Sequence, residues 1–253
     1  MAIRLDEVFV LKRVPLRETS LIVTLFGRES GKFKVLAKGV RKEKNPLSAR
    51  YEPFTHLSVV YYEKLKSDIH LASEATVIHP NSFLRERLDS FSYATYVTEL
   101  IDALFGIHDP HPKVFDLLGK GLELFQTASA VHLARVLEFK LFEQAGFFPV
   151  LTYCVLCGMR NLDKVFFSTK QGGALCPSCV RQEAGAIPLS AGTLQSLQFF
   201  LKADLKEAMS LDLSTQMEAE IDHIRRKFLQ FRLEYPLRSL HFLAELKPLL
   251  NST

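Results

Sequence analysis

The chain has 253 residues, of which 47% are hydrophobic and 24% charged, a composition that fits a soluble globular protein of one large or two smaller domains. Its net charge of +4 is uneven: the first 80 residues carry +5 and the remainder −1, which predicts that the N-terminal part faces a polyanion. No stretch approaches the roughly 18 uninterrupted apolar residues of a membrane span, and early charges exclude a signal peptide, so we expect a cytoplasmic protein.

Residues 1–80 predict a small β domain. Turn-forming or polar residues separate five short segments rich in Val, Ile, Phe and Tyr: EVFVLKRV, SLIVTLFG, KFKVLAKGV, FTHLSVVYY and IHLASEATVI. Five strands without an intervening helix favour a small antiparallel barrel or sandwich. A five-stranded barrel of this size matches the OB-fold, which binds oligonucleotides, although other small β-barrels fit the same spacing. We therefore predict an OB-fold nucleic-acid-binding domain at 1–80.

A basic loop, AKGVRKEKNPLSARY at 37–51, joins the third and fourth predicted strands. Alone, such a loop is typical of a solvated surface as well as of an anion site. Two features favour the anion site: further cations flank the first turn, and Lys32 and Lys34 share one face of a strand. The residues that we predict to contact DNA are Arg13, Arg17, Lys32, Lys34, Lys38, Arg41, Lys42, Lys44 and Arg50.

Aromatic residues are interleaved with these cations, namely Phe33, Tyr51, Phe54, Tyr61 and Tyr62. Their rings either stack on bases or fill the barrel core; we expect the core for Phe54 and for one of the two adjacent tyrosines. A cationic groove with stacking rings and no base-reading helix fits single-stranded nucleic acid, bound with little sequence preference.

From Asn81 onward the apolar spacing becomes helical, which predicts an α-helical domain over 81–253 and an α+β protein overall. The sequence HDPHP at 108–112 separates two helices, and Gly146 ends a third. Helices resume near Ser190, and a later one opens at Thr215 with an expected capping box to Glu218. An insert at about 150–183 interrupts this helical domain.

The insert contains two C-x-x-C pairs, whose ligands are Cys154, Cys157, Cys176 and Cys179, with an 18-residue spacer. Each pair can form a tight turn, and KVFFST followed by Gly172-Gly173 predicts a hairpin that brings the two turns together. This spacing is typical of one four-cysteine Zn²⁺ site. Disulfides are unusual in the cytosol, and a redox C-x-x-C lacks its βαβ context. Four sulfur ligands leave no open position, so we predict one structural zinc ion.

Signatures of catalysis and of nucleotide binding are missing from the sequence, including the phosphate-binding loop, the dinucleotide fingerprint, H-E-x-x-H and G-x-S-x-G. The eight histidines are scattered over predicted strands and helices. We therefore expect a protein that is not an enzyme, although a site assembled without a local motif stays open here.

Several stretches together resemble the RecO family of recombination mediators: LKRVPLRETSLIVTLFGRESGKFKVLAKGVRK, LARVLEFKLFEQAGFFPVLTYCVLCG, GGALCPSC and LRSLHFL. The resemblance implies an OB-fold, a helical domain and a zinc module. It also implies a non-catalytic protein that binds single- and double-stranded DNA, anneals strands and helps to load RecA onto strands coated by single-strand-binding protein. The implied partners are RecR and the acidic tail of single-strand-binding protein, in the bacterial cytoplasm at the nucleoid.

Two positions bear on this resemblance in detail. The family binds the acidic tail in its helical domain, and Arg135 is our candidate to pair with a tail carboxylate; an ordinary surface arginine near Glu138 is the alternative. Gly27 stands where the family usually has threonine or a similar residue, which affects the local turn.

Competing hypotheses for the function are a zinc-ribbon nucleic-acid-binding factor in transcription or translation, and a metal-dependent nuclease.

Overall fold

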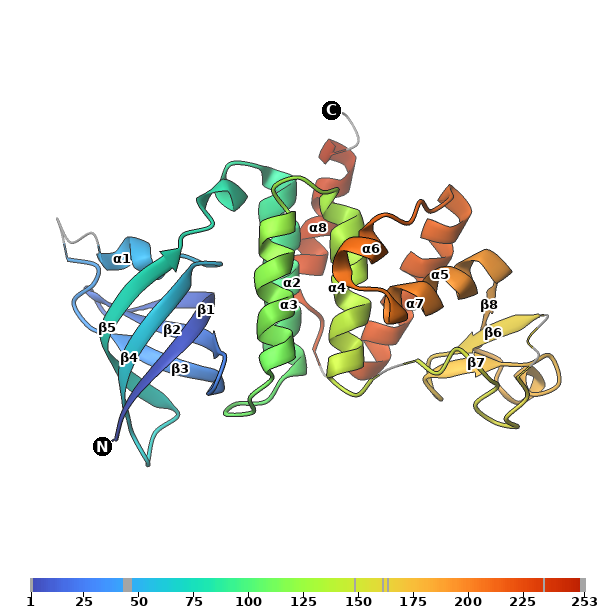
Figure 1. Cartoon of the computed structure of the whole chain (residues 1–253), viewed down its shortest axis with the longest axis horizontal. Helices are drawn as coiled ribbons and strands as arrows, with labels where there is room; N and C mark the ends of the chain where they lie inside the picture. Colours follow the sequence, from blue (N-terminus) through green and yellow to red (C-terminus); the bar gives the residue numbers. More distant parts are fainter. Residues whose placement is uncertain are drawn as a thin grey trace. The chain divides into compact units, whose positions relative to one another are not determined.

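The computed structural model describes residues 2–42, 47–147, 149–160, 162, 164–233 and 235–250, with the backbone alone for residues 47 and 247–250. The chain forms two compact units (Figure 1). The barrel unit comprises Met1–Ala134 and Leu237–Thr253, and the inner unit comprises Arg135–Pro236. The division into domains at residues 80 and 81 stays a prediction.

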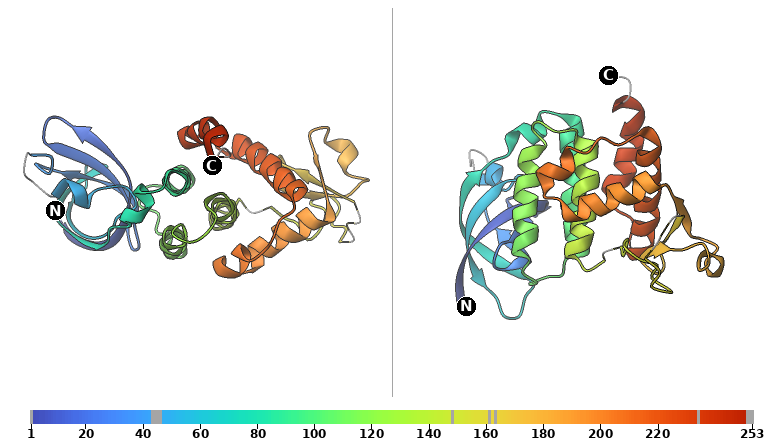
Figure 2. Two further views of the ribbon diagram at one scale, coloured as in Figure 1. Left: turned by 90° about the horizontal axis from the view of Figure 1, so that it is seen from above. Right: turned by 45° about the vertical axis from the view of Figure 1, so that its right-hand side comes forward.

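Five strands form the N-terminal sheet: β1 (Ala2–Leu16), β2 (Ser20–Gly27), β3 (Gly31–Ala37), β4 (His56–Glu63) and β5 (Ile69–His79). Their order is β1-β2-β3-β5-β4, and β1 pairs with both β2 and β4, which closes the ring seen in Figure 2. All pairs are antiparallel except β3 with β5. The sheet followed by helices confirms the α+β prediction, and the pairing order is compatible with an OB-fold.

The packing of the barrel interior explains the alternation of apolar and polar residues that predicted the strands. Along β3 every second residue is buried, so Lys32 and Lys34 do share the other face. Apolar side chains from all five strands fill the interior, and the ring centroids of Phe33 and Tyr61 lie 4.7 Å apart. Tyr51 is buried in the same core.

These positions settle the two interpretations of the aromatic residues. Phe54 is buried, as expected, and of the adjacent tyrosines Tyr61 points inward while Tyr62 is half-buried. Base stacking is wrong for Phe33 and Tyr51, because both rings are at most 4% exposed. The reason is that the alternation of each strand directs these large apolar rings into the core.

The turn between β2 and β3 is built around a buried carboxylate. Asp6 is 4% exposed and accepts hydrogen bonds from the backbone N–H groups of Glu29, at 3.2 Å, and Ser30, at 2.9 Å. A Cβ atom added at Gly27 would lie 2.2 Å from the Oδ2 atom of Asp6. Glycine at this position therefore leaves room for the carboxylate that holds the turn.

Gly27→Thr is expected to destabilise the protein by about 1–3 kcal/mol, because the added side chain must displace Asp6 from the turn. The measurement is the urea midpoint of unfolding. Gly185→Thr is the matched control, since a Cβ atom at Gly185 meets nothing within 4 Å. Equal midpoints for the two variants would contradict this account.

Helices complete the barrel unit: the four-residue α1 (Leu47–Arg50), the 3₁₀ turn η1 (Ser82–Arg85), α2 (Leu88–Leu104), α3 (Pro112–Leu124) and α8 (Arg238–Leu250). Helix α8 packs on α2. Glu99 of α2 accepts hydrogen bonds from the N–H groups of Arg238, at 3.0 Å, and Ser239, at 2.8 Å. The carboxylate thus satisfies the N-terminus of α8, whose first N–H groups lack partners within the helix.

The inner unit contains most of α4 (Ala130–Gln144), then β6 (Val165–Ser168), β7 (Gly173–Leu175), η2 (Val180–Gln182), β8 (Ile187–Leu189), α5 (Ala191–Lys202), α6 (Leu205–Met209) and α7 (Thr215–Arg232). The three strands form a small sheet in the order β7-β6-β8 (Figure 1). The N-cap of α7 is Ser214, whose side chain accepts a hydrogen bond from the N–H of Met217. The expected cap at Thr215, with its capping box to Glu218, is therefore wrong by one residue. Among the described residues, no helix is both long and apolar enough to cross a membrane.

Candidate metal centre and nucleic-acid interface

The four cysteines meet at one point. The sulfur atoms of Cys154, Cys157, Cys176 and Cys179 all lie within 4.8 Å of one another, and those of Cys157 and Cys176 are 3.7 Å apart. Tetrahedral zinc–sulfur bonds of about 2.3 Å place sulfur atoms about 3.8 Å apart. The predicted set of ligands is therefore brought together at a spacing that can hold a metal ion.

Local backbone turns position these sulfur atoms. In the first turn, the N–H of Gly158 donates to the carbonyl of Cys154, and Gly158 has a φ of 76°. In the second, the N–H groups of Cys179 and Val180 donate to the carbonyl of Cys176. The hairpin of β6 and β7 brings the two turns together, which confirms the predicted strand and return.

The electrostatics of the cluster favour a bound cation. Burial alone would raise the pKa of the Cys154 thiol, but hydrogen bonds from the backbone of Cys176, Cys157 and Leu156 lower it to about 6. The neighbouring sulfur of Cys176 raises the pKa of Cys179 to about 12. Four thiols this close cannot all ionise by themselves, because their negative charges repel each other. A soft dication such as Zn²⁺ would compensate these charges, so the donors fit the predicted metal.

A small buried cluster surrounds the sulfur atoms of this module, and Leu151, Val165, Phe167 and Ala174 are buried elsewhere in it. Its buried cluster consists of Cys154, Leu175, Cys176 and Cys179, with a few half-buried neighbours around them. Three of these four buried residues are metal-ligand candidates. The cysteine centre thus stands where a larger domain would have a hydrophobic core.

Two basic turns of the barrel lie against each other. The backbone N–H of Arg41 donates to the carbonyl of Thr19 at 2.9 Å, and its guanidinium donates to the carbonyl of Arg17 at 3.3 Å. Four of the cations predicted to bind DNA, which we call the basic turn cluster, are exposed on these turns: Arg17, Lys38, Arg41 and Lys42. A groove of about 420 Å³ adjoins them, lined by Arg13, Pro15, Leu21, Arg41, Ser48 and Glu52.

Three other cations predicted to bind DNA have protein partners. Lys32 is 13% exposed, and its Nζ lies 3.3 Å from the Oδ1 atom of Asp102 on α2. Arg13 forms an ion pair with Glu52 at 2.6 Å. Arg50 donates to the carbonyl of Ala75 at 2.7 Å. These cations fasten the barrel to neighbouring segments of the same unit.

The remaining two cations of the predicted set are Lys34 and Lys44. Lys34 is half-buried on β3, between Thr24 of β2 and Ile69 of β5 in the pairing register. Lys44 lies outside the described residues. Of the eight predicted cations that the structure describes, the four of the basic turn cluster are both exposed and on turns that contact each other.

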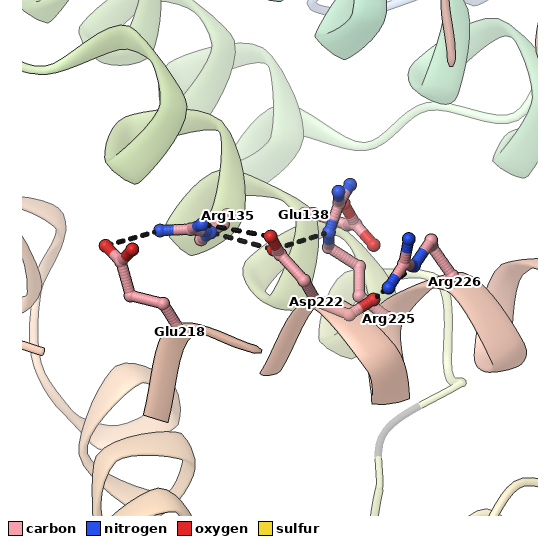
Figure 3. A network of polar contacts seen from close by, with 6 residues as sticks. All are labelled: Arg135, Glu138, Glu218, Asp222, Arg225 and Arg226. Atoms are coloured by element: carbon pink, nitrogen blue, oxygen red, sulfur yellow. Dashed lines mark hydrogen bonds and ion pairs between the residues drawn. The ribbon is translucent and has the colours of Figure 1, made fainter. Parts of the chain in front are cut away.

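Arg135 lies in an ionic network between α4 and α7 (Figure 3). Its side chain is 7% exposed, and it donates to both carboxylate oxygens of Asp222, at 2.9 and 3.0 Å, and to Glu218 at 2.8 Å. Burial would lower the pKa of Arg135, but Asp222 and Glu218 raise it. The surface position near Glu138 that we considered is wrong, since Glu138 is buried and pairs with Arg225 at 2.8 Å.

Sequence reasoning missed the acids of this network and the carboxylate of Glu99. A signal existed on α7, where Glu218 and Asp222 are four residues apart, on the same side of the helix, and Asp222 lies between the buried Ile221 and Ile224 in the chain. Acids beside an apolar face indicate a charged partner on the facing helix. The partner itself, 83 or 87 positions away in the chain, was not indicated by any local pattern.

Comparison with known proteins covers nearly the whole chain. The family described as Recombination protein O N terminal matches residues 1–81, and Recombination protein O C terminal matches residues 85–241. A DNA repair protein RecO from Pelotomaculum thermopropionicum is 33% identical over 237 residues, which cover 94% of this chain and 92% of the relative. Another from Symbiobacterium thermophilum is 32% identical over 236 residues, covering 91% and 92%. The chain therefore belongs to the RecO family of DNA repair proteins.

Proposed function

We propose that this chain is a non-catalytic recombination mediator that binds single- and double-stranded DNA, promotes strand annealing and helps to load RecA onto strands coated by single-strand-binding protein. The observation that carries the proposal is the basic turn cluster, in which four exposed cations from two turns meet beside an open groove. Membership of a DNA repair family supports DNA as the polyanion.

Binding in this proposal depends on the phosphate backbone. The cations stand on turns, without a helix or ribbon presented to a major groove, so they neutralise phosphates rather than read base edges. Strands whose phosphates are neutralised repel each other less, which favours annealing of complementary strands. Nothing in this mechanism requires turnover, and we propose that the chain acts as a binding protein in the cytoplasm.

The nine cations contribute to different extents in this proposal. Arg17, Lys38, Arg41 and Lys42 contact phosphates directly, and we assign Lys34 and Lys44 to the same role from the sequence alone. Arg13 borders the groove but is held by Glu52, while Lys32 and Arg50 support the barrel. The domain at 1–80 thus binds DNA, and the helical domain at 81–253, with its insert at about 150–183, binds partners.

We propose one structural Zn²⁺ ion per chain, held by Cys154, Cys157, Cys176 and Cys179. Four thiolates fill a tetrahedral coordination sphere and leave no position for water or substrate, so the ion stabilises the module without taking part in chemistry. The buried cluster around the sulfur atoms, in which three of four residues are cysteines, supports this assignment.

Partner binding follows from the family in this proposal, with RecR and the acidic tail of single-strand-binding protein as partners. For Arg135 to pair with a tail carboxylate, the tail must displace Asp222 or Glu218 from the guanidinium. Arg135 therefore serves as a partner-binding residue only if the α4–α7 network opens.

The role of these cations in phosphate binding is tested by a salt titration of single-stranded DNA binding. Arg41→Ala/Lys42→Ala is expected to flatten the slope of log K against log salt by about 0.7 for each phosphate that is no longer neutralised. The measurement is fluorescence anisotropy of a labelled oligonucleotide from low to moderate salt. A slope equal to that of the wild type would refute the assignment of these residues.

The matched control removes the same charge elsewhere. Lys202 and Lys206 are exposed in the inner unit, and Lys202→Ala/Lys206→Ala should leave the slope unchanged. If both double variants flatten the slope equally, the effect follows net charge, and the basic turn cluster is not the binding site.

A further inference from the structure

The first cysteine turn carries an unusual concentration of exposed apolar side chains. Tyr153 is 41% exposed, Leu156 42% and Met159 46%, all within seven consecutive residues. The N–H of Cys154 donates to the carbonyl of Met159 at 2.8 Å, so the two ends of the turn lie side by side. Exposed apolar residues on a protein surface are ordinarily scattered, and a cluster marks an interaction site. We call these three residues the knuckle face.

The module that carries the knuckle face also has exposed cations. Arg160 directly follows Met159, and Lys164 and Arg181 are exposed in the same module. Glu183, an acid of the module, accepts a hydrogen bond from the Ser168 hydroxyl at 2.6 Å. In the part of the inner unit that the structure describes, the ion pairs join Arg135 and Arg225 to acids of α4 and α7, and none engages these three cations.

We propose that the knuckle face is a second nucleic-acid site, separate from the basic turn cluster, that stacks unpaired bases of single-stranded DNA. Tyr153 offers the stacking ring, Leu156 and Met159 offer apolar contact, and the cations of the module hold the backbone. Bases stack on aromatic side chains with little dependence on sequence, and nearby cations follow the phosphates. An acidic peptide would meet the same cations, so the test below is designed to distinguish it from single-stranded DNA.

Single strands suit this face better than duplex. A duplex keeps its base faces stacked inside, and reading its edges requires an element that enters a groove. The module presents tight turns and the short strands β6 and β7, of four and three residues. An unpaired base, in contrast, exposes its face to a protruding ring. Backbone hydrogen bonds from Gly158 to Cys154 and from Cys154 to Met159 hold the turn beside Tyr153, and a metal ion bound by the four cysteines would make it more rigid.

The test compares two strands of equal length and charge, an oligothymidylate and a fully abasic strand, both bound by the full-length chain at one salt concentration. Tyr153→Ala should weaken binding to the oligothymidylate about five-fold, which corresponds to about 1 kcal/mol for one stacked base, and should leave binding to the abasic strand unchanged. Tyr153→Phe keeps the ring and should bind both strands as the wild type does.

Tyr235→Ala is the matched control, since Tyr235 is exposed in the same unit but outside the module; it should bind both strands as the wild type does. Zinc content is measured for every variant, and the wild type is also photo-crosslinked to a strand containing 5-iododeoxyuridine. Crosslinks within residues 153–160 support the proposal whether or not Tyr153→Ala keeps its metal. Crosslinks confined to the barrel would overturn it.

Two further outcomes would overturn the proposal, and a third comparison separates it from the barrel assignment. Unchanged binding of the zinc-loaded Tyr153→Ala protein to the oligothymidylate would overturn the proposal and would point to a peptide as the occupant of this face. An equal loss on both strands would overturn base stacking in favour of a contact between Tyr153 and the sugar–phosphate backbone. Failure of the basic turn cluster as a DNA site can be told apart from failure of this proposal. In the first case Arg41→Ala/Lys42→Ala binds DNA as the wild type does, while Tyr153→Ala binds the oligothymidylate more weakly.

Discussion

Cys176→Ser is expected to release the metal ion and to unfold the module at about 150–183, while the barrel unit stays folded. Cys176 is fully buried, and the buried cluster around it consists of cysteines and one leucine. Structural zinc contributes an apparent free energy of about 10–16 kcal/mol in zinc-finger peptides, which is comparable to or larger than the whole stability of a typical domain. Without the ion, the buried cluster at the two cysteine turns has one leucine left to hold it together.

Elemental analysis and hydrogen exchange measure the two parts of this result. The wild type should contain close to one zinc per chain and the variant almost none, and backbone protection should be lost in the module but kept in β1–β5. Ser178→Ala, which alters an exposed residue between Cys176 and Cys179, is the control and should retain the metal. A reduced, metal-free wild-type protein with an equally protected module would rule out the structural role.

Arg135→Leu is expected to lower the free energy of unfolding of the inner unit by about 1–3 kcal/mol, because it removes the guanidinium that pairs with Glu218 and Asp222. Asp222 keeps Arg225 at 3.6 Å, and Glu218 is partly exposed to water, which limits the loss. Arg135→Lys keeps the charge but loses the bidentate geometry, so an intermediate effect is expected. The measurement is chemical denaturation followed by a probe in the inner unit.

Arg226→Ala supplies the control on the same helix. Its guanidinium donates only to the backbone carbonyl of Asp222, at 3.1 Å, and it is exposed, so its removal should change stability by less than about 0.5 kcal/mol. If Arg135→Leu is as stable as Arg226→Ala, the network does not stabilise this unit. In that case Arg135 would be available to a partner's carboxylate.

Local patterns account for what the sequence could predict. The alternation along β3 and the two C-x-x-C pairs depend on residues close together in the chain, so the strands and the cysteine centre were foreseeable. The basic turns were also foreseeable as turns. The hydrogen bond between them, from Arg41 to Thr19, required the barrel to close first.

Whether each cation is exposed or paired with an acid could not be predicted, because the acid comes from a distant part of the chain. Lys32 is paired with Asp102, 70 positions later, and Arg135 with Asp222, 87 positions later. Both cations look like surface residues in a local window. The burial of Phe33 and Tyr51 could not be predicted either, since aromatic residues occur both in barrel cores and on surfaces that stack bases.

The contact of Glu99 with the start of α8 has a consequence for the order of synthesis. Because the helix that Glu99 caps begins at Arg238, the ribosome must translate all of residues 135–236 before α8 can reach α2. The barrel can form early during translation, but the unit to which it belongs is completed last. A ribosome that stalls within the inner unit would therefore leave the α8-binding surface of α2 uncovered.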